Sequence, residues 1–320
     1  MRVRAGMIGT GSISRVHLEW MKQREDVEIV ALCDVSKKAV AEKAGNYGAT
    51  AYTNHNDMLR ENSLDAVWIC TPPTARKGLI QSCVSRGLPV FCEKPAAFDA
   101  DTATEIARDI EEAEARVMVG YPFRVLPIIK TLKDALRDDT IHGIQSLYLC
   151  NVSLTMGLRP WFYDIEKSGG AMVDQATHVF DLLRVLFGEI CRVDALGSNP
   201  VKPKGAGYTV DEVIGLILAY DSGAVGTHLH SWVGNGWRTQ IQMSGEKKFY
   251  QLDLTGGGLD IFQGSEKIHH PLTDKQLHSY ENDVFIDMVK REDFSENPCT
   301  YEDAAKTLAL TMECNIKLAG

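Results

Sequence analysis

The sequence predicts a doubly wound α/β domain followed by an α+β domain with a large, open, mostly antiparallel sheet and helices on one face. Up to about residue 120, short apolar strands alternate with amphipathic helices. This rhythm is typical of a parallel sheet with helices on both faces. Beyond that point, strands follow one another through tight turns, which favours antiparallel pairing. A chain of 320 residues is long enough for two domains, and we place them at residues 1–121 and 122–320.

The elements of the first domain are predicted from the spacing of apolar residues. In the first helix, Ile13, Val16, Trp20 and Met21 recur at i, i+3, i+7 and i+8 and therefore share one face. Each predicted strand is a short apolar run that ends in a turn or at a proline. The strands are expected at residues 3–9, 27–33, 66–70, 89–92 and 116–120, and the helices at 12–24, 36–47, 74–86 and 101–114.

The second domain begins where this alternation stops. A long strand with alternating apolar and polar residues and a mostly apolar helix are followed by strands joined by turns such as Asp221-Ser222-Gly223. The strands are expected at residues 144–154, 213–220, 224–232, 239–244 and 249–252, and the helices at 125–137, 170–187, 280–290 and 301–318.

Composition excludes several classes of function. Asp and Glu number 43 against 34 Lys and Arg, which gives a net charge of −9 and argues against binding to nucleic acid or to an anionic membrane. No apolar run approaches the roughly 18 residues of a membrane span, and the first residues do not resemble a signal peptide. The eight cysteines contain no CxxC pair. We expect a cytoplasmic protein with reduced thiols.

A glycine-rich loop lies between the first predicted strand and helix, with Gly9, Gly11, Ser12 and Ile13 in the order Gly-Thr-Gly-Ser-Ile-Ser. The first glycine permits a tight turn, and the second lets the backbone approach a pyrophosphate at the helix N-terminus. Ser14 replaces the usual third Gly or Ala and is small enough for close packing. The alternative is a loop whose glycines serve the turn only.

Asp34 follows the second predicted strand, 20 residues beyond Ser14. A carboxylate there can accept hydrogen bonds from the adenosine ribose hydroxyls. Because it would also repel a 2′-phosphate, NAD(H) is favoured, while Lys37 and Lys38 keep NADP(H) possible. The alternative for Asp34 is a solvated turn or cap residue.

Glu93, Lys94 and Pro95 end a predicted parallel strand. Ligands of doubly wound sheets lie beyond the carboxyl ends of the strands, so Glu93 and Lys94 are expected to face the cofactor. Pro95 restricts the backbone of Lys94 and aims its side chain. A surface lysine in a turn is the alternative.

The helix predicted at residues 170–187 carries Asp174, His178 and Asp181 at i, i+4 and i+7, within an arc of roughly 60° on one face. Ionisable groups on an otherwise apolar helix are paired, solvated or functional. His178 could act as a general base that a carboxylate orients, or it could be a buried histidine bonded to a backbone carbonyl.

No metal site is predicted. His228 and His230 share one face of a strand, but no nearby Cys, Asp or Glu completes a ligand set. We interpret them as residues of the sheet face.

Taken together, these motifs resemble the glucose–fructose oxidoreductase and inositol dehydrogenase (Gfo/Idh/MocA) family over nearly the full chain. The joint occurrence of Glu-Lys-Pro and Asp-xxx-His at this separation is the most specific feature. The matching residues are the Gly9–Ile13 loop with His17, Asp34, Thr71-Pro72-Pro73, Glu93-Lys94-Pro95, Gly120-Tyr121-Pro122-Phe123-Arg124, Pro127, Trp161, Ser168-Gly169-Gly170, Asp174, His178 and Asp181.

The resemblance implies a Rossmann domain and nicotinamide-dependent oxidation or reduction of a sugar, polyol or related alcohol. It also implies a homodimer or homotetramer formed through the C-terminal sheet. Lys94 would hydrogen-bond the reacting oxygen, His178 would be the general base, and Asp174 would hold the substrate or orient His178. Arg124 and Trp161 would lie at the edge of the pocket. The cofactor would be held by Gly9, Gly11, Ser12, Ile13, Asp34, Thr71, Pro72, Glu93 and Lys94.

One departure from the family concerns Arg76, where many members carry a histidine. It could signal an acidic or phosphorylated substrate, or point to solvent. Substrate specificity is expected from the loops at residues 155–167 and 231–238. Two other functions stay open: a regulatory protein that binds the dinucleotide without catalysis, and a relative that cleaves glycosides through transient oxidation.

Overall fold

The computed structural model describes residues 2–152, 160–205, 207–273 and 276–319. The chain forms two compact units. Unit 1 comprises Met1–Val125 and Lys275–Lys306, and unit 2 comprises Leu126–Asp274 and Thr307–Gly320. The predicted boundary at residue 121 lies close to the first crossing, but the structure returns residues 275–306 to unit 1.

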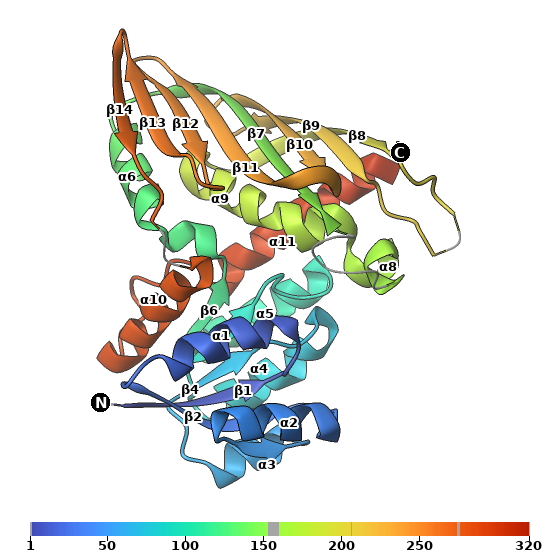
Figure 1. Ribbon diagram of the computed structural model, residues 1–320, viewed down its shortest axis with the longest axis vertical. Coiled ribbons are helices and arrows are strands. Elements are labelled where there is room, and N and C mark those ends of the chain that lie inside the picture. The colour runs from blue at the N-terminus through green and yellow to red at the C-terminus, as the bar shows by residue number, and fades with distance from the viewer. Residues whose placement is uncertain (1, 153–159, 206, 274–275, 320) are drawn as a thin grey trace. The chain divides into compact units, whose positions relative to one another are not determined.

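Unit 1 is built on a six-stranded parallel sheet in the order β3-β2-β1-β4-β5-β6 (Figure 1). The prediction of a doubly wound sheet is confirmed. Because the strands are parallel, the carboxyl ends of β1, β2, β4 and β5 meet at one edge, where ligands bind in such sheets. The strands are β1 (Val3–Ile8), β2 (Val27–Cys33), β3 (Thr50–Tyr52), β4 (Ala66–Ile69), β5 (Val90–Glu93) and β6 (Val117–Gly120).

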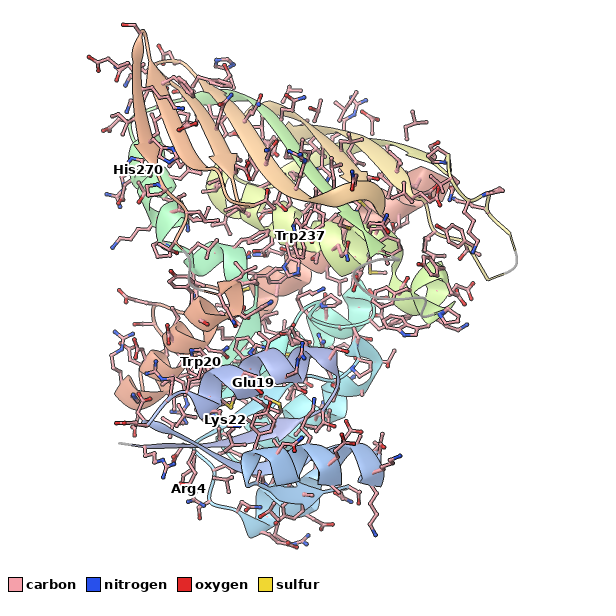
Figure 2. The ribbon with its side chains drawn as sticks, in the orientation of Figure 1. Arg4, Glu19, Trp20, Lys22, Trp237 and His270 are labelled. Carbon is pink, nitrogen blue, oxygen red and sulfur yellow. The ribbon has the colours of Figure 1, made fainter. Side chains whose placement is uncertain are left out.

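The helices of unit 1 cover this sheet with their apolar faces. On α1, Trp20 is buried, whereas Glu19 and Lys22 are exposed (Figure 2). The helix at the return of the chain, α10, buries Phe285 and Ile286 in the same core as β1, β4 and α1. The helices and 3-10 turns are α1 (Ser12–Lys22), α2 (Lys37–Tyr47), α3 (His55–Glu61), η1 (Pro73–Ala75), α4 (Arg76–Val84), α5 (Ala100–Glu112), η2 (Pro122–Val125) and α10 (Leu277–Arg291).

Unit 2 contains an eight-stranded sheet in the order β14-β13-β12-β11-β7-β10-β9-β8. All neighbours pair antiparallel except β7 and β10, which are parallel. The predicted mostly antiparallel sheet is therefore confirmed. The strands are β7 (Ile141–Asn151), β8 (Ile190–Ser198), β9 (Val213–Tyr220), β10 (Val225–Ser231), β11 (Val233–Gly245), β12 (Phe249–Asp253), β13 (Gly258–Gln263) and β14 (Glu266–His270).

Helices of unit 2 cover one face of its sheet (Figure 1). Burial alternates along β10, where Gly226, His228 and His230 are buried and Val225, Thr227 and Leu229 are exposed. This alternation identifies the covered and the open face. The helical elements are α6 (Pro127–Leu136), η3 (Pro160–Tyr163), α8 (Ile165–Ser168), η4 (Met172–Ala176), α9 (Thr177–Phe187) and α11 (Tyr301–Ala319), of which α11 begins in unit 1.

Two predicted elements differ from the structure. The single helix expected at residues 170–187 begins as a π-helical turn, η4, before α9. The loop expected at residues 231–238 is instead largely strand, because β11 starts at Val233 and continues through a register shift before Arg238. Within the described part of the chain, no helix combines the length and apolarity needed to span a bilayer.

Candidate active site

The two glycines of the predicted phosphate loop are needed for different structural reasons. Gly9 has φ +94°, and a Cβ there would lie 2.7 Å from the carbonyl carbon and oxygen of Cys70. At Gly11, a Cβ would meet no atom within 4 Å. The fold of unit 1 therefore requires the first glycine, whereas the space beside the second is open for a ligand to approach the backbone.

A hollow of about 400 Å³ adjoins this loop and is lined by Thr10, Gly11, Ser12, Arg15 and Lys43. Gly11 is the N-cap of α1 and supplies no side-chain cap, and the first turn of α1 contains no acidic residue. A helix N-terminus flanked by two cations suits an anion. The loop thus fits the pyrophosphate of a dinucleotide.

Lys43 is a part of this loop that sequence reasoning missed. Its Nζ donates to the carbonyl oxygens of Thr10 at 2.9 Å and Gly11 at 3.2 Å, and to Ser14 Oγ at 3.2 Å. Lys43 therefore fixes the loop from α2. Nothing in the periodicity of that helix distinguishes Lys43 from its other exposed lysines.

Asp34 is bound to the same loop. Its Oδ2 accepts from the Thr10 backbone N at 2.8 Å and from Thr10 Oγ1 at 2.9 Å, and its Oδ1 accepts from the Ser36 backbone N at 2.9 Å. Partial burial acts to raise the pKa of Asp34, but these hydrogen bonds outweigh it and lower the pKa. An ionised carboxylate is thus fixed at the end of β2, beside the phosphate loop.

Thr71 and Pro72 follow β4 at the same edge of the sheet. Thr71 Oγ1 is buried and has no hydrogen-bond partner, and Pro72 is exposed at the start of η1. A buried hydroxyl without a partner is rare in a folded protein. This one fits a polar group of a bound ligand.

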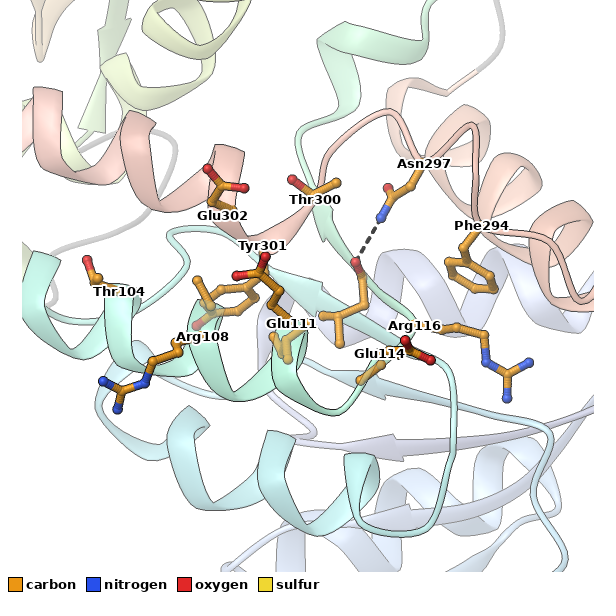
Figure 3. Close-up of a pocket in the computed structure, with 14 residues that line it drawn as sticks. Thr104, Arg108, Glu111, Glu114, Arg116, Phe294, Asn297, Thr300, Tyr301 and Glu302 are labelled. Carbon is orange, nitrogen blue, oxygen red and sulfur yellow. Dashed lines mark hydrogen bonds between the residues drawn. The ribbon is translucent and has the colours of Figure 1, made fainter.

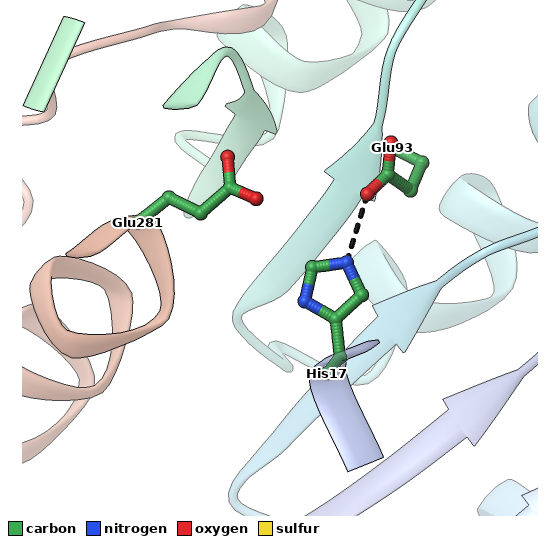
Figure 4. A group of neighbouring side chains, drawn as sticks. All are labelled: His17, Glu93 and Glu281. Atoms are coloured by element: carbon green, nitrogen blue, oxygen red, sulfur yellow. Dashed lines mark hydrogen bonds and ion pairs between the residues drawn. The ribbon is translucent and has the colours of Figure 1, made fainter. Parts of the chain in front are cut away.

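Glu93 is expected to face the cofactor, and this role stays a prediction. Its side chain is buried in unit 1, and its Oε1 lies 2.8 Å from His17 Nε2 (Figure 4). As the last residue of β5, Glu93 is paired with Gly120 in the sheet. The end of β5 is thus bound to α1 through a buried hydrogen bond.

The hydrogen-bond network around His17 joins α1 to β5 and α10. Trp68 Nε1 donates to Asn282 Oδ1 at 2.9 Å, and Asn282 Nδ2 donates to the His278 carbonyl oxygen at 2.8 Å. His17 Nδ1, 3.0 Å from Asn282 Oδ1, must therefore donate to it. Burial acts to raise the pKa of Glu93, but the bond with His17 lowers it well below its usual range. His17 thus links Asn282 to the buried Glu93 carboxylate.

Glu281 adds a second carboxylate to this cluster. Its Oε1 lies 2.8 Å from His278 Nδ1, its Oε2 is buried without a hydrogen-bond partner, and burial raises its pKa. Ligand atoms of His17, Glu93 and Glu281 lie within 4.8 Å of one another, a spacing that a metal ion could use. Because both nitrogens of His17 already form hydrogen bonds, we interpret the cluster as a proton-sharing network.

Lys94 is half-buried at the end of β5 and begins an irregular segment. Arg76 is only 2% exposed, and its guanidinium donates to four backbone carbonyl oxygens. Arg76 Nη2 lies 2.9 Å from Thr71 O and 3.1 Å from Lys94 O, and Nη1 donates to the carbonyl oxygens of Glu93 and Pro95. Neither expectation for Arg76, a substrate contact or a solvent-exposed side chain, is correct, because backbone carbonyls occupy its donors.

In unit 2, Asp174 and His178 are more exposed than their neighbours in the helix. Of residues 171–184, all of which the structure describes, these two alone are not buried. Asp174 lies in the π-helical turn η4, and His178 in the first turn of α9. Turns of this kind often occur at functional sites. The otherwise buried helix thus leaves one carboxylate and one imidazole partly exposed.

Asp181 is different from its two predicted partners. It is fully buried, and its Oδ1 accepts from Thr307 Oγ1 at 3.0 Å, while Arg184 Nη1 donates to Thr307 at 2.6 Å. The expected 60° arc assumed an uninterrupted α-helix, which the π-helical turn breaks. Asp181 belongs to a polar network in the core of unit 2.

Arg124 and Trp161, predicted at the pocket's edge, have contrasting surroundings. Arg124 is buried, donates to the Pro298 carbonyl oxygen at 2.9 Å and pairs with Asp303. Trp161 is 44% exposed and stacks on Phe162. Their roles toward a substrate stay predictions. Part of the specificity loop expected at residues 155–167 lies outside the described residues, which resume at 160.

The two histidines of β10 lie on the covered face of the sheet. His228 and His230 are buried, and Ser146 Oγ lies 2.8 Å from His228 Nδ1. Burial lowers the pKa of His228 to about 3, so this imidazole is neutral. These positions agree with their interpretation as residues of the sheet face.

A larger hollow of unit 1 lies away from this edge. It has a volume of about 470 Å³ beside β6 and is lined by residues of α5 and of the segment after α10 (Figure 3). Asn297 Nδ2 donates to Val117 O across its floor at 2.8 Å. Since Val117 begins β6, this hollow lies at the amino end of the strand, opposite the edge where doubly wound sheets bind cofactors.

The comparisons with known proteins agree with this geometry. Residues 3–121 match the profile of the oxidoreductase family with an NAD-binding Rossmann fold, and residues 129–251 match the GFO/IDH/MocA C-terminal domain. The chain belongs to the Gfo/Idh/MocA oxidoreductase family. Its N-terminal domain is therefore a Rossmann domain for a nicotinamide cofactor.

Relatives in this Gfo/Idh/MocA family include an inositol 2-dehydrogenase from Rhizobium meliloti, 31% identical over 226 residues. That alignment covers 70% of this chain and 64% of the relative. A solved structure of a putative myo-inositol dehydrogenase from Sinorhizobium meliloti is 25% identical, covers 99% of this chain and 97% of its own, and has a TM-score of 0.81. A UDP-N-acetylglucosamine 3-dehydrogenase from Acidithiobacillus ferrooxidans shares the fold at 19% identity and TM-score 0.84, with coverage of 99% and 98%.

Proposed function

We propose that this protein is a nicotinamide-dependent dehydrogenase that acts on a CH–OH group of a sugar, an inositol-like polyol or a related alcohol. The observation that carries the proposal is the edge of the unit 1 sheet. There the phosphate loop, the ionised Asp34 and the half-buried Lys94 follow β1, β2 and β5. The inositol dehydrogenases among its relatives support a polyol as the substrate class.

The cofactor would be held by the residues that fit it. Gly9, Gly11, Ser12 and Ile13 would bind the pyrophosphate, and Asp34 would bind the ribose hydroxyls. Thr71 and Pro72 would contact the end of the cofactor that lies far from the adenosine ribose. The nicotinamide, when bound, supplies the hydride acceptor or donor. Lys94 would donate a hydrogen bond to the reacting oxygen.

His178 would remove the hydroxyl proton while the carbinol C–H bond breaks as hydride, so that the alcohol becomes a carbonyl. Asp174 would hold the substrate or orient the His178 imidazole. Arg124 and Trp161 would contact the substrate at the edge of its pocket.

The substitution Lys94→Ala tests this assignment. We expect NADH still to bind and turnover to fall by roughly 10² or more, the scale of a general acid–base group. The matched control is Lys77→Ala, because Lys77 is an exposed lysine of α4 paired with Glu105. Near-normal turnover of Lys94→Ala, or NADH binding by the wild type without turnover of any member of a sugar and polyol panel, would contradict the proposal.

NAD(H) is favoured over NADP(H). The hydrogen bonds from Thr10 and Ser36 hold the Asp34 carboxylate at the end of β2, where it would accept from the two ribose hydroxyls and repel a 2′-phosphate. Lys37 and Lys38 begin α2 nearby and are exposed. These two cations would attract a 2′-phosphate, so NADP(H) is the alternative cofactor.

We also propose that the open face of the unit 2 sheet binds a second copy of the chain. This face exposes Leu196, Ile217, Val225 and Leu229 at 44–76% of their surface. A hollow of about 480 Å³ lies among them. Contiguous exposed apolar residues mark interaction surfaces, and the family resemblance implies a dimer or tetramer through this sheet.

A further inference from the structure

The segment that follows β5 is a run of mostly buried backbone without regular pairing. β5 ends at Glu93, and Pro95, Ala96 and Ala97 are buried outside any helix or strand. Buried carbonyl groups need hydrogen-bond partners. In unit 1 these partners are side chains. Arg76 donates to the carbonyl oxygens of Glu93, Lys94 and Pro95, and Tyr301 Oη donates to that of Ala96.

Arg76 is suited to this task by its shape. A guanidinium presents five N–H donors in a rigid planar fork, whereas a lysine amine has three donors on a flexible stem. Arg76 is the first residue of α4, and its Nε and Nη2 also donate to Thr71 O at 3.2 and 2.9 Å. One side chain thus ties the segment after β5 to the segment after β4. No acidic side chain in the described ranges pairs with it.

These contacts determine where Lys94 points. A peptide unit is planar, so a carbonyl held in place fixes the orientation of its whole plane. Arg76 holds the Glu93 carbonyl on one side of the Lys94 Cα and the Lys94 carbonyl on the other. Both backbone dihedral angles of Lys94, and with them the direction of its Cβ, are therefore fixed.

We propose that Arg76 is a positioning residue for Lys94, which fixes the two peptide planes around Lys94 so that its amine reaches the reacting oxygen. This inference rests on the proposed function of Lys94. Many family members carry a histidine at this position, and the inference gives the arginine of this chain a role in catalytic geometry.

The substitution Arg76→Lys keeps the positive charge but removes the planar guanidinium and its five N–H donors. Because a misplacement of about 1 Å can lower a rate by 10²-fold, we expect kcat to fall roughly 10- to 100-fold. KM for the alcohol and Kd for NADH should stay within about threefold, the pattern of an interaction that matters in the transition state. Independently of turnover, amide hydrogen exchange should accelerate at Lys94 and Ala96, whose N–H groups belong to peptide units that Arg76 holds.

The control is Lys77→Met, which removes the neighbouring cation of α4 and should leave kcat and exchange unchanged. Rates are normalised to NADH-binding sites, so that unfolded protein is not counted as slow enzyme. The inference is overturned by wild-type kcat in Arg76→Lys, by a raised KM at constant kcat, or by a loss of rate explained entirely by lost NADH sites. Unchanged amide exchange also overturns it.

Lys94→Ala, measured in parallel, separates this inference from the proposed function. If Lys94→Ala turns over normally, the function assigned to Lys94 fails first. If Lys94→Ala loses turnover and Arg76→Lys retains it, only the role of Arg76 is wrong.

Discussion

His17 Nε2 lies 2.8 Å from Glu93 Oε1, and the two side chains are 0% and 6% exposed. A carboxylate without access to water is stabilised only while its hydrogen-bond partner is present, because its charge alone would be buried without compensation. The pair joins α1 to the end of β5, one residue before Lys94. Its loss should therefore affect both the stability of unit 1 and the strand end that carries Lys94.

We predict that His17→Leu lowers the free energy of unfolding by roughly 3–5 kcal/mol, because it leaves the Glu93 carboxylate buried and unpaired. The double variant His17→Leu/Glu93→Leu should recover most of this loss. Urea unfolding of the wild type, both single variants and the double variant gives the coupling energy. His55→Leu, which removes a half-buried histidine bonded to Ser82, is the control. Additive effects of the two substitutions would contradict the pairing.

The same pair predicts how stability depends on pH. Since the folded state lowers the pKa of Glu93 from its usual 4.5, the unfolded chain binds the proton more readily. The stabilisation is therefore fully present above pH 4.5 and is lost as the pH falls below it. Glu93→Gln should flatten this part of the stability profile. An unchanged slope between pH 5 and the acid transition would show that Glu93 is not ionised in the folded protein.

Gly9 and Gly11 should respond differently to alanine. Gly9→Ala places a Cβ 2.7 Å from the Cys70 carbonyl at φ +94°, so the melting temperature should fall. Gly11→Ala has open space and should retain its melting temperature while NADH binding weakens, because the methyl group occupies the approach to the backbone. Thermal unfolding and NADH fluorescence titration measure the two effects. Loss of stability in both variants, with equal binding, would contradict this division.

The sequence predicts most elements of unit 1 because most of its strands and helices carry a local pattern, whereas the short β3 (Thr50–Tyr52) and α3 (His55–Glu61) are not predicted. The loop at Gly9–Ile13 and Asp34 are adjacent to strand ends, so position along the chain already implies position at the edge of the sheet. Arg76 and Lys43 could not be placed in this way. Their partners are backbone carbonyls or residues far away in the chain, and no periodicity encodes such contacts.

The helix with Asp174 and His178 shows a second limit. Its apolar composition predicts a buried helix, and the structure confirms one, but a π-helical turn at Met172–Ala176 changes which side chains share a face. Asp181, three residues after His178 in the regular helix α9, lies in the core with Thr307, so the roughly 60° arc spans both partly exposed and buried positions. Similarly, α10 returns to unit 1 through Phe285 and Ile286, which an amphipathic pattern cannot reveal because it does not name the surface that the helix covers.

Asp34 should determine the preference between the two cofactors. Asp34→Asn retains an acceptor for Thr10 and removes the charge that would repel a 2′-phosphate. We expect the ratio of NADPH to NADH affinity to rise about tenfold, or roughly 1.4 kcal/mol. Fluorescence titration with both cofactors measures it. Lys37→Ala/Lys38→Ala should leave NADH affinity unchanged, and equal binding of NADPH and NADH by the wild type would contradict the assignment.

The open sheet face predicts an assembly that charged substitutions disrupt. Leu229 lies opposite Leu147 on β7 and Gly215 on β9, so an aspartate at 229 would stand in the middle of the apolar surface. In a two-fold interface each residue occurs twice, and both carboxylates would be desolvated on association. We expect Leu229→Asp to lower the oligomer mass in light scattering, whereas Ile316→Asp, a change at a 70% exposed residue of α11, should not. A monomeric wild type, or an unchanged mass for Leu229→Asp, would show that this face does not bind a second copy.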